Sequence, residues 1–195
     1  MLIKAIPTGA KLLILFAAPA VLVACVEPAD EGGPSVVFDV CRPTVLQVPA
    51  DATADERLGV EGAIALWNQV SGPQLTLSDR PATDPPALDP TRPLAPPVDE
   101  QDRQRLSIGF RAAAPLFFGL YRPDVGDILI NRGIQSQRAR EIIIAHEIGH
   151  AFGLPHIIDQ QSLMNPGNTQ VPPAPQETAL LQRQQGPCTG TPPVP

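Results

Sequence analysis

Lysine is almost absent from this sequence of 195 residues, and its two lysines, Lys4 and Lys11, both lie near the N-terminus. The rest of the chain carries 12 arginines and 20 acidic residues, so its formal net charge is 12 − 20 = −8. A chain this acidic has little positive charge with which to neutralise phosphates. The composition therefore predicts no binding to nucleic acid.

Long apolar runs are also scarce. Residues 12–24 form a thirteen-residue stretch without a charge, preceded by the two lysines. This pattern is typical of a secretory signal peptide, because the run is too short to span a bilayer comfortably as a helix. We therefore expect residues 1–24 to be a signal peptide and the mature protein to act outside the cytoplasm.

The end of this stretch, Leu22-Val23-Ala24-Cys25, resembles a bacterial lipobox. The resemblance implies cleavage before Cys25 and lipidation of its sulfur, so that the protein is anchored to the outer membrane or cell surface without spanning it. Residues 25–35 would then form a flexible tether. The alternative is an ordinary secretory signal with an incidental Cys25, which would give a secreted protein.

Cysteine is rare as well, with three in the chain. Without Cys25, the remaining pair in an exported protein predicts a Cys41–Cys188 disulfide. In the chain-entropy model a bridge over a loop of about 150 residues stabilises the fold by roughly 4 kcal/mol. Cys41 as a blocker of a metal site is less favoured, because the short stretch between Cys25 and Cys41 leaves no room for a folded pro-domain.

Periodicity and turn signals predict one α+β domain over residues 36–188, followed by a disordered tail at 189–195. A capping-box pattern at Thr53 opens the first predicted helix, in which Trp67 is a core anchor. The predicted order is a strand within 36–48, a helix to Val70 stopped by Gly72, a strand at 75–77, a proline-rich surface insertion at 80–98, strands at 106–111 and 126–131, a helix at 136–152 and a short helix at 175–185.

All three histidines of the chain lie within eleven residues, in the pattern HExxHxxGxxH. His146 and His150 are four residues apart, so on a helix both imidazoles project from one face and can share a metal ion. Gly153 can adopt the left-handed conformation that ends the helix, which would return His156 as a third ligand. Three imidazoles with an open fourth position are typical of catalytic zinc. The alternative, three purely structural histidines at this spacing, is less favoured.

The pattern resembles the signature of metzincin metallopeptidases, and Ser162-Leu163-Met164-Asn165-Pro166 resembles their methionine turn. The spacing of Met164 after the third histidine is similar to that of matrixins. The resemblance implies a mixed, mostly parallel twisted sheet packed with an N-terminal helix and an active-site helix, and a small C-terminal subdomain. It also implies that Met164 lies beneath the histidines without binding zinc.

Some family features are missing. Residue 157 is Ile, where matrixins often have serine and other metzincins have an acid. Pro166 stands where astacins and serralysins have a tyrosine. No histidine remains for a second, structural zinc. Calcium binding by acids such as Asp124, Asp127 or Asp159 is an open alternative to which we do not commit, since isolated acids are usually solvated.

The implied activity is that of a zinc-dependent endopeptidase acting on a protein or peptide through a zinc-bound water, with Glu147 as general base. By analogy with the family, the substrate would lie along an edge strand near residues 126–131. We expect a monomer. The alternative function is that of a catalytically silent or narrow-scope surface lipoprotein that binds a protein partner.

Overall fold

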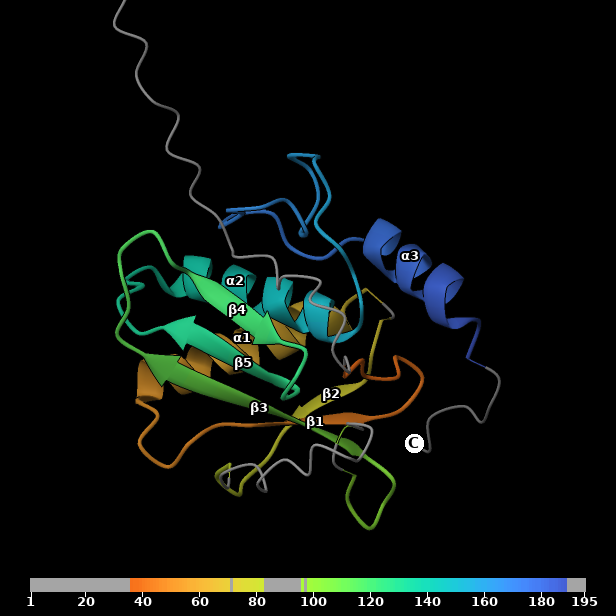
Figure 1. Cartoon of the computed structure of the whole chain (residues 1–195), viewed down its shortest axis with the longest axis horizontal. Coiled ribbons are helices and arrows are strands. Elements are labelled where there is room, and N and C mark those ends of the chain that lie inside the picture. Colours follow the sequence, from red (N-terminus) through yellow and green to blue (C-terminus); the bar gives the residue numbers. More distant parts are fainter. Residues whose placement is uncertain (1–35, 71, 83–95, 97, 189–195) are drawn as a thin grey trace, which may run out of the picture.

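The computed structural model describes residues 36–70, 72–82, 96 and 98–188 (Figure 1). The predicted signal peptide, Cys25, the predicted tether, most of the proline-rich insertion and the predicted C-terminal tail lie outside the described residues. No helix within the described ranges is both long enough and apolar enough to cross a membrane. The elements are β1 (Thr44–Gln47), α1 (Ala54–Asn68), β2 (Leu75–Leu77), β3 (Gln104–Arg111), β4 (Gly119–Arg122), β5 (Asp127–Asn131), α2 (Gln137–Ala151) and α3 (Pro175–Gln185).

The five strands form one sheet in the order β2-β1-β3-β5-β4. Strand β1 pairs in parallel with β2 and β3, and β3 pairs in parallel with β5, whereas β4 runs antiparallel to β5. The predicted class, α+β with a mostly parallel sheet, is confirmed. The edge strand β4 was not predicted, because four residues that follow an exposed, proline-containing loop carry too little periodicity to indicate a strand.

The first predicted strand is shorter than expected. Within residues 36–48 only Thr44–Gln47 belongs to the sheet. The chain turns just before it, where Arg42 N–H donates to the Asp39 carbonyl at 3.2 Å. Pro43 interrupts the segment because it has no N–H to donate to a neighbouring strand. The residues before the turn are nevertheless fixed, since Phe38 N–H donates to the Ala151 carbonyl at the end of α2 at 2.8 Å.

Helix α1 begins with the predicted capping box. The Thr53 side chain accepts from Glu56 N–H at 3.2 Å, and the Glu56 carboxylate accepts from Thr53 N–H at 2.7 Å. Trp67 is fully buried and donates its indole N–H to the Ala145 carbonyl at 2.9 Å, which ties α1 to α2. Gly72 does not stop the helix as expected, because the helix already ends at Asn68 and its C-cap, Gln69, has a right-handed conformation.

Helices α1 and α2 lie side by side on one face of the sheet, and α3 lies beyond the end of α2 (Figure 1). The core between helices and sheet includes a fully buried set on α2: Ile142, Ile143, Ile144 and Ile148. Because α2 is apolar around so much of its surface, it is enclosed by other elements. The polar side chains near its C-terminal end, His146, Glu147 and His150, are therefore buried.

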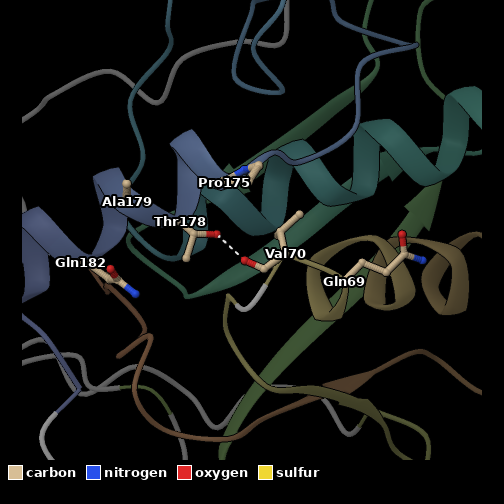
Figure 2. Close-up of a pocket in the computed structure, with 6 residues that line it drawn as sticks. All are labelled: Gln69, Val70, Pro175, Thr178, Ala179 and Gln182. Atoms are coloured by element: carbon tan, nitrogen blue, oxygen red, sulfur yellow. Dashed lines mark hydrogen bonds between the residues drawn. The ribbon is translucent and has the colours of Figure 1, made fainter.

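Helix α3 contacts the end of α1 through a side-chain hydrogen bond. Thr178 donates its hydroxyl to the Val70 carbonyl at 3.1 Å, beside a shallow hollow between the two helices (Figure 2). No residue of the histidine motif lines this hollow, which is formed by Gln69, Val70, Pro175, Thr178, Ala179 and Gln182.

The two ends of the domain are joined by a disulfide between Cys41 and Cys188, 147 residues apart. Gln185 reinforces this junction through its amide, which donates to the carbonyls of Phe38 at 3.0 Å and Phe152 at 2.7 Å. The same side chain accepts from Val40 N–H at 2.8 Å. The N-terminal segment, the end of α2 and the end of α3 thus form one cross-linked unit.

Removal of the disulfide should destabilise the domain without abolishing its fold. A double Cys41→Ser, Cys188→Ser variant should lose about 4 kcal/mol of unfolding free energy, because the unfolded chain regains the entropy of a long loop. Urea unfolding of both proteins under oxidising conditions measures the difference. Reduction of the parent should reproduce the loss, and equal stability of the two proteins would contradict the expectation.

Candidate metal centre

Helix α2 carries the first two histidines of the motif. Ser136 caps its N-terminus by accepting from Ala139 N–H at 3.2 Å. His146 and His150 lie one turn apart near its C-terminal end, and both are buried. Their four-residue spacing places the two imidazoles on one face of the helix, as predicted.

Gly153 reverses the chain directly after α2. Its φ of +90° is a conformation that residues with a side chain rarely adopt. The reversal is held by backbone bonds from Gly153 N–H to the His150 carbonyl at 2.8 Å and from Leu154 N–H to the Gly149 carbonyl at 3.0 Å. The chain therefore turns back along the helix end, and His156 comes to lie beside the first two histidines.

The three imidazoles converge through their Nε2 atoms. His150 Nε2 lies 3.1 Å from His146 Nε2 and 3.2 Å from His156 Nε2. The ligand atoms of the three residues all lie within 4.8 Å of one another. Three nitrogens bound tetrahedrally to one zinc ion at 2.0–2.1 Å would be about 3.3 Å apart. The separations from His150 Nε2 are close to this value.

Two backbone carbonyls determine which ring nitrogens can bind a metal. Nδ1 of His146 lies 2.8 Å from the Leu163 carbonyl oxygen, and Nδ1 of His150 lies 2.8 Å from that of Leu154. Because a carbonyl can only accept, each Nδ1 must carry the proton and each Nε2 then presents a lone pair. Lone pairs at 3.1 Å repel unless they share a cation. The donor set therefore fits zinc.

Burial keeps these histidines neutral. Desolvation lowers the pKa of His146 to about 4, although its hydrogen bond to Leu163 acts in the opposite direction. Desolvation, reinforced by the proximity of His146, lowers the pKa of His150 to about 3. At neutral pH a metal ion would have no proton to displace from either imidazole.

Met164 packs against helix α2. It is fully buried, and a Cβ added to Gly149 would lie 2.5 Å from its sulfur, so a larger residue at that position of α2 would require Met164 to shift. The turn that carries Met164 is joined to the segment of the third histidine, because Ile157 N–H donates to the Met164 carbonyl at 2.9 Å. Met164 therefore lies against α2 beside Gly149, and its role beneath the three histidines stays a prediction.

Glu147, the proposed general base, points from α2 towards the edge strand β4. It is almost fully buried, and one carboxylate oxygen accepts from Tyr121 N–H at 2.8 Å. A Cβ on Gly119 would lie 2.8 Å from the other oxygen, so the glycine makes room for the carboxylate. Sequence reasoning missed both β4 residues, since nothing in their spacing connects them with Glu147.

The predicted position of the substrate-binding edge is wrong. The segment 126–131 contains β5, which lies between β3 and β4 and is not at the edge of the sheet. The edge beside α2 is β4. The error follows from the missed strand, because without β4 the strand 126–131 would have been the last in the sheet.

Two of the three acids considered for calcium have other contacts. Asp127 accepts a two-pronged hydrogen bond from Arg122, and Asp159 accepts from Gln161 N–H at 2.9 Å. Asp124 is exposed. Within the described ranges, the one group of three or more candidate ligands that could hold a metal is His146, His150 and His156.

Comparison with known proteins gives one family match that covers the histidine motif. The matrixin family model matches residues 94–181, a range that contains the three histidines, Glu147 and Met164. No curated protein matches the chain. A zinc-dependent peptidase from Methanocorpusculum labreanum has a similar structure at a TM-score of 0.39 and 16% identity, with 75% of this chain and 95% of that chain covered. The matrixin match, which covers less than half of the chain, and the histidine cluster fit the binding of zinc.

The histidine burial predicts how the metal-free protein responds to acid. Above pH 6.5 the histidines are neutral in both the folded and the unfolded state, and they contribute no pH dependence. Below pH 6.5 the unfolded chain binds protons that the folded chain excludes, until the pH approaches 4 for His146 and 3 for His150. The unfolding free energy should therefore fall by up to about 1.4 kcal/mol per pH unit for each histidine.

Urea unfolding of the metal-free protein at pH 7.5 and pH 5 measures this loss. A His150→Gln variant, which removes one titrating group, should show a shallower decline between the same two pH values. An equally steep decline in that variant would contradict the assignment of the effect to the buried histidines.

Proposed function

We propose that this protein is a zinc-dependent endopeptidase, with His146, His150 and His156 as the zinc ligands and Glu147 as the general base. The observation that carries the proposal is the convergence of three Nε2 atoms, two of which, those of His146 and His150, are left unprotonated by a backbone acceptor on Nδ1. A buried carboxylate adjoins His146 in the sequence, and the matrixin match covers the whole constellation. The substrate would be a protein or peptide.

The residues of the chain divide the chemistry between them. When bound, zinc supplies a Lewis acid that activates water and polarises the scissile carbonyl. The Glu147 carboxylate takes the proton of the attacking water and delivers it to the leaving amine. Tyr121 N–H orients that carboxylate through its 2.8 Å hydrogen bond. Met164 supports the histidines from below and makes no contact with substrate.

The outer edge of β4 offers a site for the substrate main chain. Strand β4 pairs with β5 on one side, and Tyr121 N–H of β4 donates to Glu147. An extended peptide added to this edge would form main-chain hydrogen bonds with the strand. Because β4 also contacts Glu147, such a peptide would place its backbone beside the general base. This position replaces the one near residues 126–131.

The location of the protein is proposed from its N-terminus. The apolar stretch 12–24 and the lipobox-like end at Cys25 support export and anchoring through lipid on Cys25. The catalytic domain would then act on proteins at the outer membrane or cell surface.

Replacement of Glu147 should abolish cleavage and leave the metal in place. Glu147→Gln preserves side-chain shape but cannot accept the proton, so kcat/KM should fall by about a hundredfold to ten-thousandfold. The full chain is incubated with a diverse peptide library, cleavage products are identified by mass spectrometry, and zinc is measured in each protein. Glu61→Gln, which removes an exposed carboxylate of α1, is the matched control and should cleave like the parent.

The outcomes separate the two candidate functions. Cleavage by the parent and the control but not by Glu147→Gln, with about one zinc in each, supports the peptidase. Zinc without cleavage by any protein would favour a partner-binding role or a single dedicated substrate. A folded parent that binds no zinc would contradict the central proposal.

Replacement of Cys25 should release the protein from the membrane. In a bacterial host, Cys25→Ser removes the sulfur that would be acylated, so the chain should move from the membrane fraction to the soluble fraction and lose label from a fatty-acid precursor. If the parent is itself soluble and unlabelled, the segment is an ordinary secretory signal.

A further inference from the structure

Glu177 is a buried carboxylate that the mechanism does not use. It lies in the first turn of α3 and is fully buried. One oxygen accepts from the Ser162 hydroxyl at 2.8 Å and from Leu163 N–H at 3.2 Å, and the other accepts from Ala174 N–H at 2.9 Å. Among the described residues, no ion pair involves Glu177.

A carboxylate in this position is costly, because burial removes its hydration and no cation replaces it. Capping of α3 does not require burial, since an exposed acid at the same helical position could also accept from Ala174 N–H. The other two hydrogen bonds of Glu177 go to the turn that carries Met164. The carboxylate therefore connects α3 with the segment next to the zinc ligands.

A continuous line of hydrogen bonds runs from Glu177 to His146. The Ser162 hydroxyl, which donates to Glu177, accepts from Met164 N–H at 3.0 Å. This N–H belongs to the same peptide group as the Leu163 carbonyl. That carbonyl in turn accepts from Nδ1 of His146 at 2.8 Å.

Every donor in this line points towards the carboxylate. The Nδ1–H of His146 donates to the peptide group, the peptide N–H donates to the hydroxyl, and the hydroxyl donates to Glu177. Hydrogen bonds aligned in this way polarise one another, and the effect is larger in a buried, low-dielectric setting. Negative charge at Glu177 thus makes the Leu163 carbonyl a stronger acceptor and His146 Nε2 a stronger donor to metal.

We propose that Glu177 is a positioning residue of the metal centre, which acts on His146 through Ser162 and the peptide group between Leu163 and Met164. A carboxylate that accepts directly from a ligating histidine is a common way to orient the ring and raise its basicity. Here a hydroxyl and a peptide group carry the same influence over a longer path. This inference rests on the proposed zinc site.

A second side chain secures the carbonyl in the middle of the line. Asn168 donates to the Leu163 carbonyl at 3.1 Å and to the Val171 carbonyl at 2.7 Å. Its own carbonyl accepts from Val171 N–H at 2.9 Å. The Leu163 carbonyl is therefore held from two directions, so its orientation towards His146 does not depend on the histidine alone.

The test compares zinc affinity in the full chain and its variants. Glu177→Gln preserves size and removes the charge, and Ser162→Ala removes the hydroxyl from the line while leaving Glu177 in place. Each should weaken zinc binding about fivefold in a chelator competition, less than the ~10–100-fold loss typical of a direct hydrogen-bond partner of a ligand. Gln184→Ala, an exposed residue of α3, is the control and should bind zinc like the parent.

A spectroscopic readout separates positioning from general stability. In the cobalt-substituted proteins, Glu177→Gln and Ser162→Ala should shift the visible absorption bands, because the donor strength of His146 changes. The double variant should lose little more affinity than Glu177→Gln, since both changes interrupt one line.

The inference is overturned if both variants unfold more easily but match the parent in zinc affinity and cobalt spectrum. If Glu177→Gln fails to fold, Ser162→Ala decides the question by the same two measurements. A parent that binds no zinc would instead refute the proposed function, so the two failures are distinguishable.

Discussion

The hydrogen bonds from two histidine Nδ1 atoms to the carbonyls of Leu154 and Leu163 are the interactions on which the site depends. They leave the Nε2 lone pairs facing one another at 3.1 Å, an arrangement that a neutral cluster would not favour and a cation resolves. Local turns of the backbone position both carbonyls. The reversal at Gly153 positions the Leu154 carbonyl, and the turn before Met164 positions the Leu163 carbonyl.

The rest of the domain holds these two carbonyls still. Helix α2 is enclosed by α1 and the sheet, so the histidines cannot turn outward without disrupting the core. The reversal after α2 is secured from outside by Gln185, which donates to the Phe152 carbonyl. The Met164 turn is held by α3 through Glu177. The small C-terminal part of the fold therefore supports the metal centre from two sides, and the Cys41–Cys188 disulfide binds it to the N-terminal segment.

The edge strand β4 links the fold to the proposed chemistry. It is the one antiparallel strand of the sheet, and it contacts Glu147 both through Tyr121 N–H and through the space left by Gly119. A main-chain donor and a missing side chain thus shape the surroundings of the proposed base. If substrate binds along this edge, recognition of its backbone and placement of its scissile bond depend on the same four residues.

The sequence by itself determined which three histidines could share a metal ion, the helix that carries two of them, the turn at Gly153 and the α+β class. These depend on side-chain identity at short spacing, where helical geometry is regular enough to predict which groups meet. Tertiary structure decided which strand forms the edge, which carbonyls orient the histidines and where Glu177 acts. Those features depend on backbone groups and on contacts between distant segments. Every residue carries the same carbonyl, and every residue except proline carries the same N–H, so no pattern of side chains distinguishes Leu154, Leu163 or Tyr121 in advance.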